Sequence, residues 1–422
     1  MKVKKMLAVF MSVLSLAACI LPFSGCGKTV GKVHNKGVKS GAVRDLTEGI
    51  SKNESASKAP DDEFKAAASS FAAELFKDNY SKGKTTLVSP LSVLTALALV
   101  QNGAEGETLA QLERALGGLD RDALNKYMRA YCDFLSESDE LKIANSVWTD
   151  SSVEAKQAFL QKAVDSYSAQ IFSASLSSKK TVSSINSWVK KNTDGMIPKI
   201  IENADRDAVM MLINAIAFDA KWETPYKRSD IEKLEFTSYS GSKKKTDFMC
   251  STENIYLKDG GTVGFMKPYK NGRFAFAALL PNEDVSIDDY IASLSGEKLM
   301  KIFSSAKKNE EVDVKMPKFK AEYSTQLIDT LKKMGVKDAF DSKTADFSSL
   351  IENRDAYIAT VVHKTFIEVD ENGTRAAAST LVGISKMSMP AINPVCLNRP
   401  FVYMIVDTET NLPLFIGVQT EI

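Results

Sequence analysis

The chain has 422 residues, of which 44% are hydrophobic and 25% are charged, proportions typical of a soluble globular protein with a large core. The 54 lysines and arginines balance 53 aspartates and glutamates, so nothing in the composition indicates binding to nucleic acid. The chain has two histidines and no HExxH, GxSxG, GxGxxG or P-loop pattern, which argues against hydrolases, kinases and dehydrogenases. We expect neither enzymatic activity nor a metal or other cofactor.

The first 26 residues have the pattern of a bacterial export signal. Three lysines precede an apolar run over residues 6–23, which is typical of a secretory signal and not of a folded element. Phe23-Ser24-Gly25-Cys26 then resembles a lipobox, which predicts a lipoprotein signal peptide over residues 1–26 and lipidation of Cys26. Leu16-Ala17-Ala18-Cys19 is a second lipobox pattern, with Cys19 as the lipidated residue, and plain secretion or a retained anchor is a third reading.

Residues 27–60 contain almost no large apolar side chains. Such a segment buries too little surface to fold, so it is predicted to be a flexible tether between the lipid and a domain over residues 61–422. Together, signal and tether predict an extracellular lipoprotein on the surface of a bacterium, bound to the membrane through its lipid anchor.

Helical patterns dominate the first half of the domain. Apolar residues recur at helical spacing from Phe64 to Leu75, and Ser89-Pro90 has the N-cap and first-position residues of a second helix. The predicted helices cover residues 62–77, a segment starting at 90, and residues 105–117, 121–136, 153–167, 181–192 and 324–335.

Strand patterns dominate the second half. The predicted strands cover residues 141–148, 210–220, 273–280, 312–320, 357–370, 400–407 and 413–418. Helices followed by strands, without regular alternation, predict a single α+β domain. His363 falls inside an apolar strand and is therefore expected to be a hydrogen-bonded core residue rather than a catalytic one.

One segment is unusual for a loop. A strand ends near Glu371, and after Gly373 the side chains up to Thr380 are small except for Arg375, followed by a long stretch to Pro400. Long loops without secondary structure are uncommon and usually functional. Alanine, serine and threonine also enter a sheet without steric conflict on either face.

In this segment the chain resembles the serpin family. An acid followed by Gly-Thr, a charged residue and several alanines resembles the hinge of inhibitory serpins, and Asn398-Arg399-Pro400-Phe401 lies at the centre of a motif similar to the family signature. Ser89-Pro90-Leu91-Ser92 and His363-Lys364 are similar to further family motifs, so the resemblance extends over residues 61–422.

The resemblance implies a serpin fold with a large antiparallel or mixed central sheet, an exposed reactive-centre loop and assigned roles for particular residues. It implies Trp222 at the breach, where the sheet opens. It places the polar shutter under the sheet at Ser89, Ser92, Asn214 and His363. It places the loop hinge at Glu371, Gly373, Thr374, Arg375, Ala376, Ala377, Ala378, Ser379 and Thr380.

The resemblance also implies a mechanism and a target. A serine protease cleaves the loop between Met387 and Ser388 and forms an acyl-enzyme, and the freed hinge then fills a vacant strand position in a metastable sheet. Met387 suits the apolar pockets of elastase-, chymotrypsin- or subtilisin-like proteases, whereas cleavage after Lys386 would indicate a trypsin-like target. We expect a monomeric inhibitor; the alternative is a non-inhibitory serpin that acts as a surface binding protein.

Overall fold

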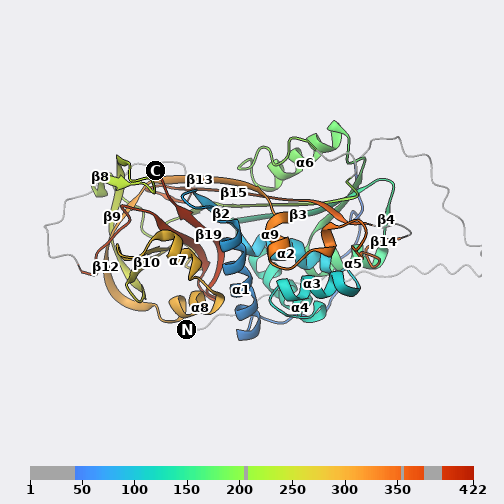
Figure 1. Ribbon diagram of the computed structural model, residues 1–422, viewed down its shortest axis with the longest axis horizontal. Helices are drawn as coiled ribbons and strands as arrows, with labels where there is room; N and C mark the ends of the chain where they lie inside the picture. The colour runs from blue at the N-terminus through green and yellow to red at the C-terminus, as the bar shows by residue number, and fades with distance from the viewer. Residues whose placement is uncertain (1–42, 204–207, 353–355, 375–391) are drawn as a thin grey trace, which may run out of the picture. The chain divides into compact units, whose positions relative to one another are not determined.

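The computed structural model describes residues 43–203, 208–352, 356–374 and 392–422, which belong to one compact unit. Within these residues the fold is α+β, as predicted, with helices concentrated in the first part and two large sheets (Figure 1). The helices are α1 (Asp62–Asn79), α2 (Pro90–Gln101), α3 (Gly106–Ala115), α4 (Arg121–Ser136), α5 (Gln157–Tyr167), α6 (Lys179–Asn192), α7 (Ile287–Ala292), α8 (Gly296–Ser304) and α9 (Ile328–Lys333).

Most of the predicted helices are present because their ends carry strong local signals. Asp61 caps α1 by accepting a hydrogen bond from the amide of Phe64, and Ser89 caps α2 with Pro90 at its first position, as predicted. The predicted bounds of α4 are confirmed to the residue. Across the part of the chain that the structure describes, no helix has the length and apolar character needed to cross a membrane.

The first sheet contains the strand that carries His363 and the first residues of the hinge strand, Gly373 and Thr374. Its strands follow the order β1 (Arg44–Asp45), β5 (Gln170–Ala174), β3 (Leu141–Asp150), β6 (Met210–Phe218), β15 (Ile358–Val369), β16 (Gly373–Thr374) and β7 (Ala220–Lys221), with β13 (Phe319–Gln326) on the other edge of β15. β6 and β15 are parallel neighbours, whereas β13 and β16 pair with β15 antiparallel.

The strands of the second large sheet come mainly from residues 231–317 and 395–419. Its order is β17 (Val395–Cys396), β12 (Lys307–Pro317), β9 (Lys243–Asp259), β10 (Thr262–Pro268), β11 (Phe274–Leu280), β18 (Phe401–Asp407), β19 (Leu412–Gln419) and β2 (Thr86–Val88), and β8 (Ile231–Thr237) pairs with β9. A separate small sheet pairs β4 (Glu154–Ala155) with β14 (Ile351–Glu352).

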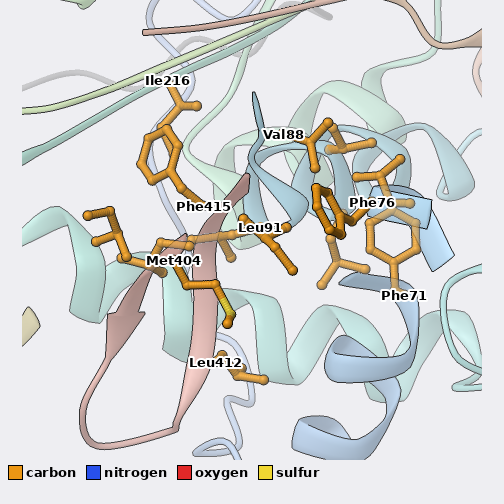
Figure 2. Close-up of a cluster of buried hydrophobic side chains, with 14 of the residues drawn as sticks. Phe71, Phe76, Val88, Leu91, Ile216, Met404, Leu412 and Phe415 are labelled. Atoms are coloured by element: carbon orange, nitrogen blue, oxygen red, sulfur yellow. The ribbon is translucent and has the colours of Figure 1, made fainter. Parts of the chain in front are cut away.

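Two hydrophobic cores lie on opposite faces of the first sheet. The larger core joins α1 and α2 to β6, β18 and β19; Figure 2 shows Phe71, Leu91, Ile216 and Phe415 of this cluster. The smaller core lies under α6, which covers the other face of the sheet in Figure 1. β6 is buried on both faces and is hydrophobic at every position except Asn214, which is why the sequence predicts it so clearly.

Three predicted elements need correction. The strand predicted over residues 312–320 is two strands in different sheets, because β12 ends at Pro317 and β13 begins at Phe319. The helix predicted over residues 324–335 begins only at Ile328, since the preceding residues extend β13 along β15. The helix predicted from residue 153 begins at Gln157, because β4 occupies the positions before it.

The flexible tether predicted over residues 27–60 is wrong for residues 43–60. β1 pairs antiparallel with β5, and Leu46 and Ile50 pack against the larger core. The amide of Asn53 donates to Oδ1 of Asp165 at 2.8 Å. Composition does not predict this docking, because the segment pairs with the edge of a sheet formed by other residues and has no core of its own.

Candidate functional site

The hinge begins in a tight turn at the end of β15. Oδ1 of Asp370 accepts hydrogen bonds from the amides of Asn372 at 2.7 Å and Gly373 at 3.2 Å, and the amide of Asp370 donates to the carbonyl of Gly373 at 3.0 Å. Burial raises the pKa of the Asp370 carboxyl, although these amide donors oppose the shift. The turn brings the chain back along β15 as β16.

β16 already stands in the sheet. Thr374 pairs with Val369 of β15 on one side and with Ala220 of β7 on the other. Thr374 is fully buried, and its hydroxyl lies 2.5 Å from the hydroxyl of Tyr269. A Cβ on Gly373 would lie 2.0 Å from the carbonyl oxygen of Ala220, so the close approach of the two strands requires glycine here.

Two aromatic residues hold the turn from outside, and we call them the clamp: Trp222 and Tyr226. Nε1 of Trp222 donates to the carbonyl of Asp370 at 2.8 Å, and the amide of Trp222 donates to the carbonyl of Asn372 at 2.9 Å. The amide of Tyr226 donates to the carbonyl of Glu371 at 2.9 Å. All three turn carbonyls are therefore bound by the clamp.

The side chains around the clamp add an ion pair and a ring stack. Trp222 stacks on Tyr269 with 4.6 Å between ring centroids, which ties the clamp to the residue that follows β10. Glu371 lies 2.7 Å from Nζ of Lys318. Burial raises the pKa of Glu371, but the hydrogen bond and charge of Lys318 together with a backbone hydrogen bond outweigh it, and the net shift of the pKa is downward.

Below the hinge the sheet is closed. β6 and β15 pair directly in parallel, from Ile358 opposite Met210 to Phe366 opposite Ala217. The vacant strand position expected from the sequence is therefore wrong as a description of this state. Buried backbone N–H and C=O groups need hydrogen-bond partners. β6 and β15 therefore pair with each other as long as no other strand lies between them.

The four predicted shutter residues meet behind this pair of strands. The amide of Ser89 donates to Nε2 of His363 at 3.0 Å, and Nδ1 of His363 lies 2.6 Å from Oδ1 of Asn214. Since Nε2 accepts, Nδ1 carries the proton and donates to Asn214. Nδ2 of Asn214 donates to the carbonyl and the hydroxyl of Ser92, at 2.7 and 2.5 Å.

Asn145 on β3 is a further member of the shutter that the sequence reasoning missed. Its Oδ1 accepts from Nδ2 of Asn214 at 2.5 Å, which links β3 to β6 and, through His363, to β15. The register gives the signal that could have found it, because Asn145 and His363 both stand opposite Asn214.

His363 is held neutral. It is fully buried, and burial lowers its pKa to about 3. Its two ring nitrogens are occupied by Ser89 and Asn214, so it is a hydrogen-bonded core residue, as predicted from the sequence.

The comparisons with known proteins agree with this geometry. The family model "Serpin (serine protease inhibitor)" matches residues 66–421. The chain belongs to the serpin family. It is 31% identical over 368 residues to Serpin-Z7 of Hordeum vulgare, covering 82% of this chain and 92% of that protein. It is 29% identical over 380 residues to human Serpin B4, covering 83% and 97% of the two chains.

Solved serpin structures confirm the predicted serpin fold. The native state of tengpin, a thermophilic serpin, superposes with a TM-score of 0.86 at 42% identity, covering 90% of this chain and all of that one. The latent state of tengpin superposes with a TM-score of 0.77 at 40% identity, covering 87% and 100%. The better match to a native serpin agrees with a sheet into which only Gly373 and Thr374 of the described hinge have entered.

The rest of this serpin's loop is anchored at its far end. The amide of Ile392 donates to Oδ2 of Asp313 at 2.7 Å, and Val395 pairs with Val314 of β12. The remaining predicted loop and anchor residues lie outside the described residues: Cys19, Cys26, Arg375, Ala376, Ala377, Ala378, Ser379, Thr380, Lys386, Met387 and Ser388.

Proposed function

We propose that this serpin inhibits serine-type proteases as a suicide substrate. The protease serine attacks the carbonyl carbon of the scissile bond in the loop, forms an ester with the N-terminal fragment and releases the amine of the C-terminal fragment. The freed hinge then enters the first sheet as a new strand between β6 and β15. The attached protease is carried along and distorted before water can cleave the ester.

The observation that supports this proposal is the position of Gly373 and Thr374. They pair with β15 and β7 at the end of the sheet, next to the line along which β6 and β15 pair with each other. We call this line the seam. Continued in the same direction, the hinge runs antiparallel to β6 and to β15. One parallel pairing is thereby replaced by two antiparallel ones, which are slightly more stable per residue.

A gel assay tests the inhibitory mechanism. We expect a band that survives SDS, near the summed mass, after mixing with an elastase-, chymotrypsin- or subtilisin-like protease. Thr374→Arg places a charge at a buried position and should turn the inhibitor into a cleaved substrate without a stable complex. If the wild type is cleaved by all of these proteases and traps none, it is a non-inhibitory serpin instead.

We propose Met387–Ser388 as the scissile bond, which makes the preferred target a protease with an apolar pocket. The mass of the released C-terminal peptide tests this choice. A peptide that starts at Ser388 supports it, whereas one that starts at Met387 shows cleavage after Lys386 and a trypsin-like target.

We further propose that the protein acts outside a bacterial cell as a monomer held by a lipid on Cys26. The lipobox pattern and the charged and apolar segments before it support this placement. Cells grown with labelled fatty acid should label the wild type and the Cys19→Ser variant but not Cys26→Ser. Labelling lost only in Cys19→Ser would move the anchor to that residue.

A further inference from the structure

A buried ion pair lies beside the clamp. Nζ of Lys267 on β10 lies 2.7 Å from Oε1 of Glu253 on β9, and the two side chains are only 3% and 9% exposed. Taking two charges out of water is costly unless they are paired and hydrogen-bonded. Neither residue belongs to the hinge or to the shutter, so their place in the molecule needs another explanation.

Lys267 contacts both rings of the clamp, and Glu253 is linked to Tyr226 through Ser251. Nζ of Lys267 lies 4.4 Å from the ring centroid of Tyr226 and 5.6 Å from that of Trp222, within the range of cation–π attraction. Glu253 also accepts a hydrogen bond from Oγ of Ser251 at 2.6 Å, and this Oγ lies 3.2 Å from the hydroxyl of Tyr226. Tyr226 is thus fixed at its ring face and at its hydroxyl.

The clamp in turn fixes the hinge. The three hydrogen bonds from Trp222 and Tyr226 end on the carbonyls of Asp370, Glu371 and Asn372, immediately before β16. A rotation of the Trp222 ring away from Lys267 would move Nε1 from the carbonyl of Asp370. The other two donors are backbone amides, so they move only if the backbone of residues 222–226 shifts with the rings. The ion pair is therefore one contact away from the indole hydrogen bond to the carbonyl of Asp370. It also holds the ring of Tyr226, whose backbone amide binds the carbonyl of Glu371.

We propose that Lys267 and Glu253 are positioning residues for loop insertion. Their pair keeps the clamp closed on the turn, so that the first two residues of the hinge stand between β15 and β7 before a protease arrives. The effect on inhibition rests on the function proposed above. The effect on the hinge does not.

The consequence is kinetic. After acylation, hinge insertion competes with hydrolysis of the ester. A hinge whose first residues are already paired in the sheet should insert faster than one that is free. Loss of the ion pair should free the hinge and delay insertion. More inhibitor is then cleaved per protease trapped, while the rate of the first encounter, which depends on the loop itself, stays the same.

Hydrogen exchange tests the positioning role without a protease. In Lys267→Met, amides in peptides covering residues 220–226 and 370–374 should exchange about tenfold faster than in the wild type. Lys298→Met is the matched control, because Lys298 pairs with Asp259 at 2.9 Å and lies 4.8 Å from the ring of Tyr290, far from the turn in sequence and contacts. Unchanged exchange in Lys267→Met, or equal acceleration in the control, overturns the proposal.

A double variant separates positioning from the cost of an unpaired charge. Lys267→Met with Glu253→Gln buries no charge, so it should regain the wild-type midpoint of urea unfolding. It still has no cation at the clamp rings, so fast exchange at residues 370–374 should persist. If exchange returns to the wild-type rate together with the unfolding midpoint, the pair serves stability alone and the proposal is wrong.

Titration of active protease completes the test. The stoichiometry of inhibition should rise several-fold in Lys267→Met and in the double variant, with an unchanged association rate, and stay at the wild-type value in Lys298→Met. A wild-type stoichiometry in Lys267→Met overturns the kinetic consequence. If the wild type traps no protease while the exchange results hold, the inhibitory function fails and the positioning role stands.

Discussion

At the scale of single residues, the missing side chain of Gly373 decides whether β16 can enter the sheet. An alanine Cβ would meet backbone atoms, at 2.0 Å from the carbonyl oxygen of Ala220 and 2.7 Å from Cα of Lys221. Backbone cannot rotate away as a side chain can, so Gly373→Ala should lower the free energy of unfolding by about 1–3 kcal/mol in urea titrations. Gly261→Ala, which meets only the side chain of Asn282 at 3.3 Å, is the control and should change it less.

His363 should make stability depend on pH. Its pKa is about 3 in the folded protein and 6.5 for the free side chain, so between these values the unfolded chain holds a proton that the folded chain lacks. The contribution is complete above pH 6.5 and is lost as pH falls towards 3, by about 1.4 kcal/mol per pH unit. The difference in unfolding free energy between wild type and His363→Gln should shrink accordingly on acidification; a difference independent of pH would contradict this.

At the scale of elements, the segment over residues 43–60 should stabilise the sheet edge that it covers. β1 pairs with β5 and is followed by Leu46 and Ile50, which pack on the core. Deleting residues 1–60 should lower the free energy of unfolding by about 1–3 kcal/mol through lost apolar burial, measured by urea titration. Deleting only residues 1–42 is the control and should lower it less, and equal loss in both variants would contradict the assignment.

The same scale shows what a sequence can and cannot predict. Caps and strong periodicity predicted α1, α2 and α4, and an apolar run interrupted only by Asn214 predicted β6. The strand β9 was missed because its exposed lysines hide the alternation of a half-buried strand. Local sequence patterns could not predict β16, because it is only two residues long. Nor could they predict the contact of Asn145, which depends on its position opposite Asn214 on the neighbouring strand.

The site shows the same division. Motifs identified Ser89, Ser92, Asn214 and His363, because a resemblance carries residues whose contacts are far apart in the chain. It did not identify Lys267 or Glu253, whose pairing depends on how β9 and β10 fold together. Nor could it show that β6 and β15 close on each other in this state.

At the scale of the whole molecule, the closed seam between β6 and β15 predicts a fold that gains stability when the loop is cut. The two described ends of the loop are held at Thr374 in the first sheet and at Ile392, whose amide donates to Asp313 of β12. In the mechanism proposed above, cleavage frees one end, and the inserted strand would replace one parallel ladder by two antiparallel ladders.

Protein nicked within residues 375–391 should therefore melt at least about 10 °C above the intact protein in scanning calorimetry, since each kcal/mol shifts the midpoint by a few degrees. The control is Thr374→Arg nicked at the same bond, in which the charged side chain opposes entry of the strand, so its midpoint should rise less. A wild type whose midpoint does not rise on cleavage holds no stored free energy, and trapping by insertion would have no driving force.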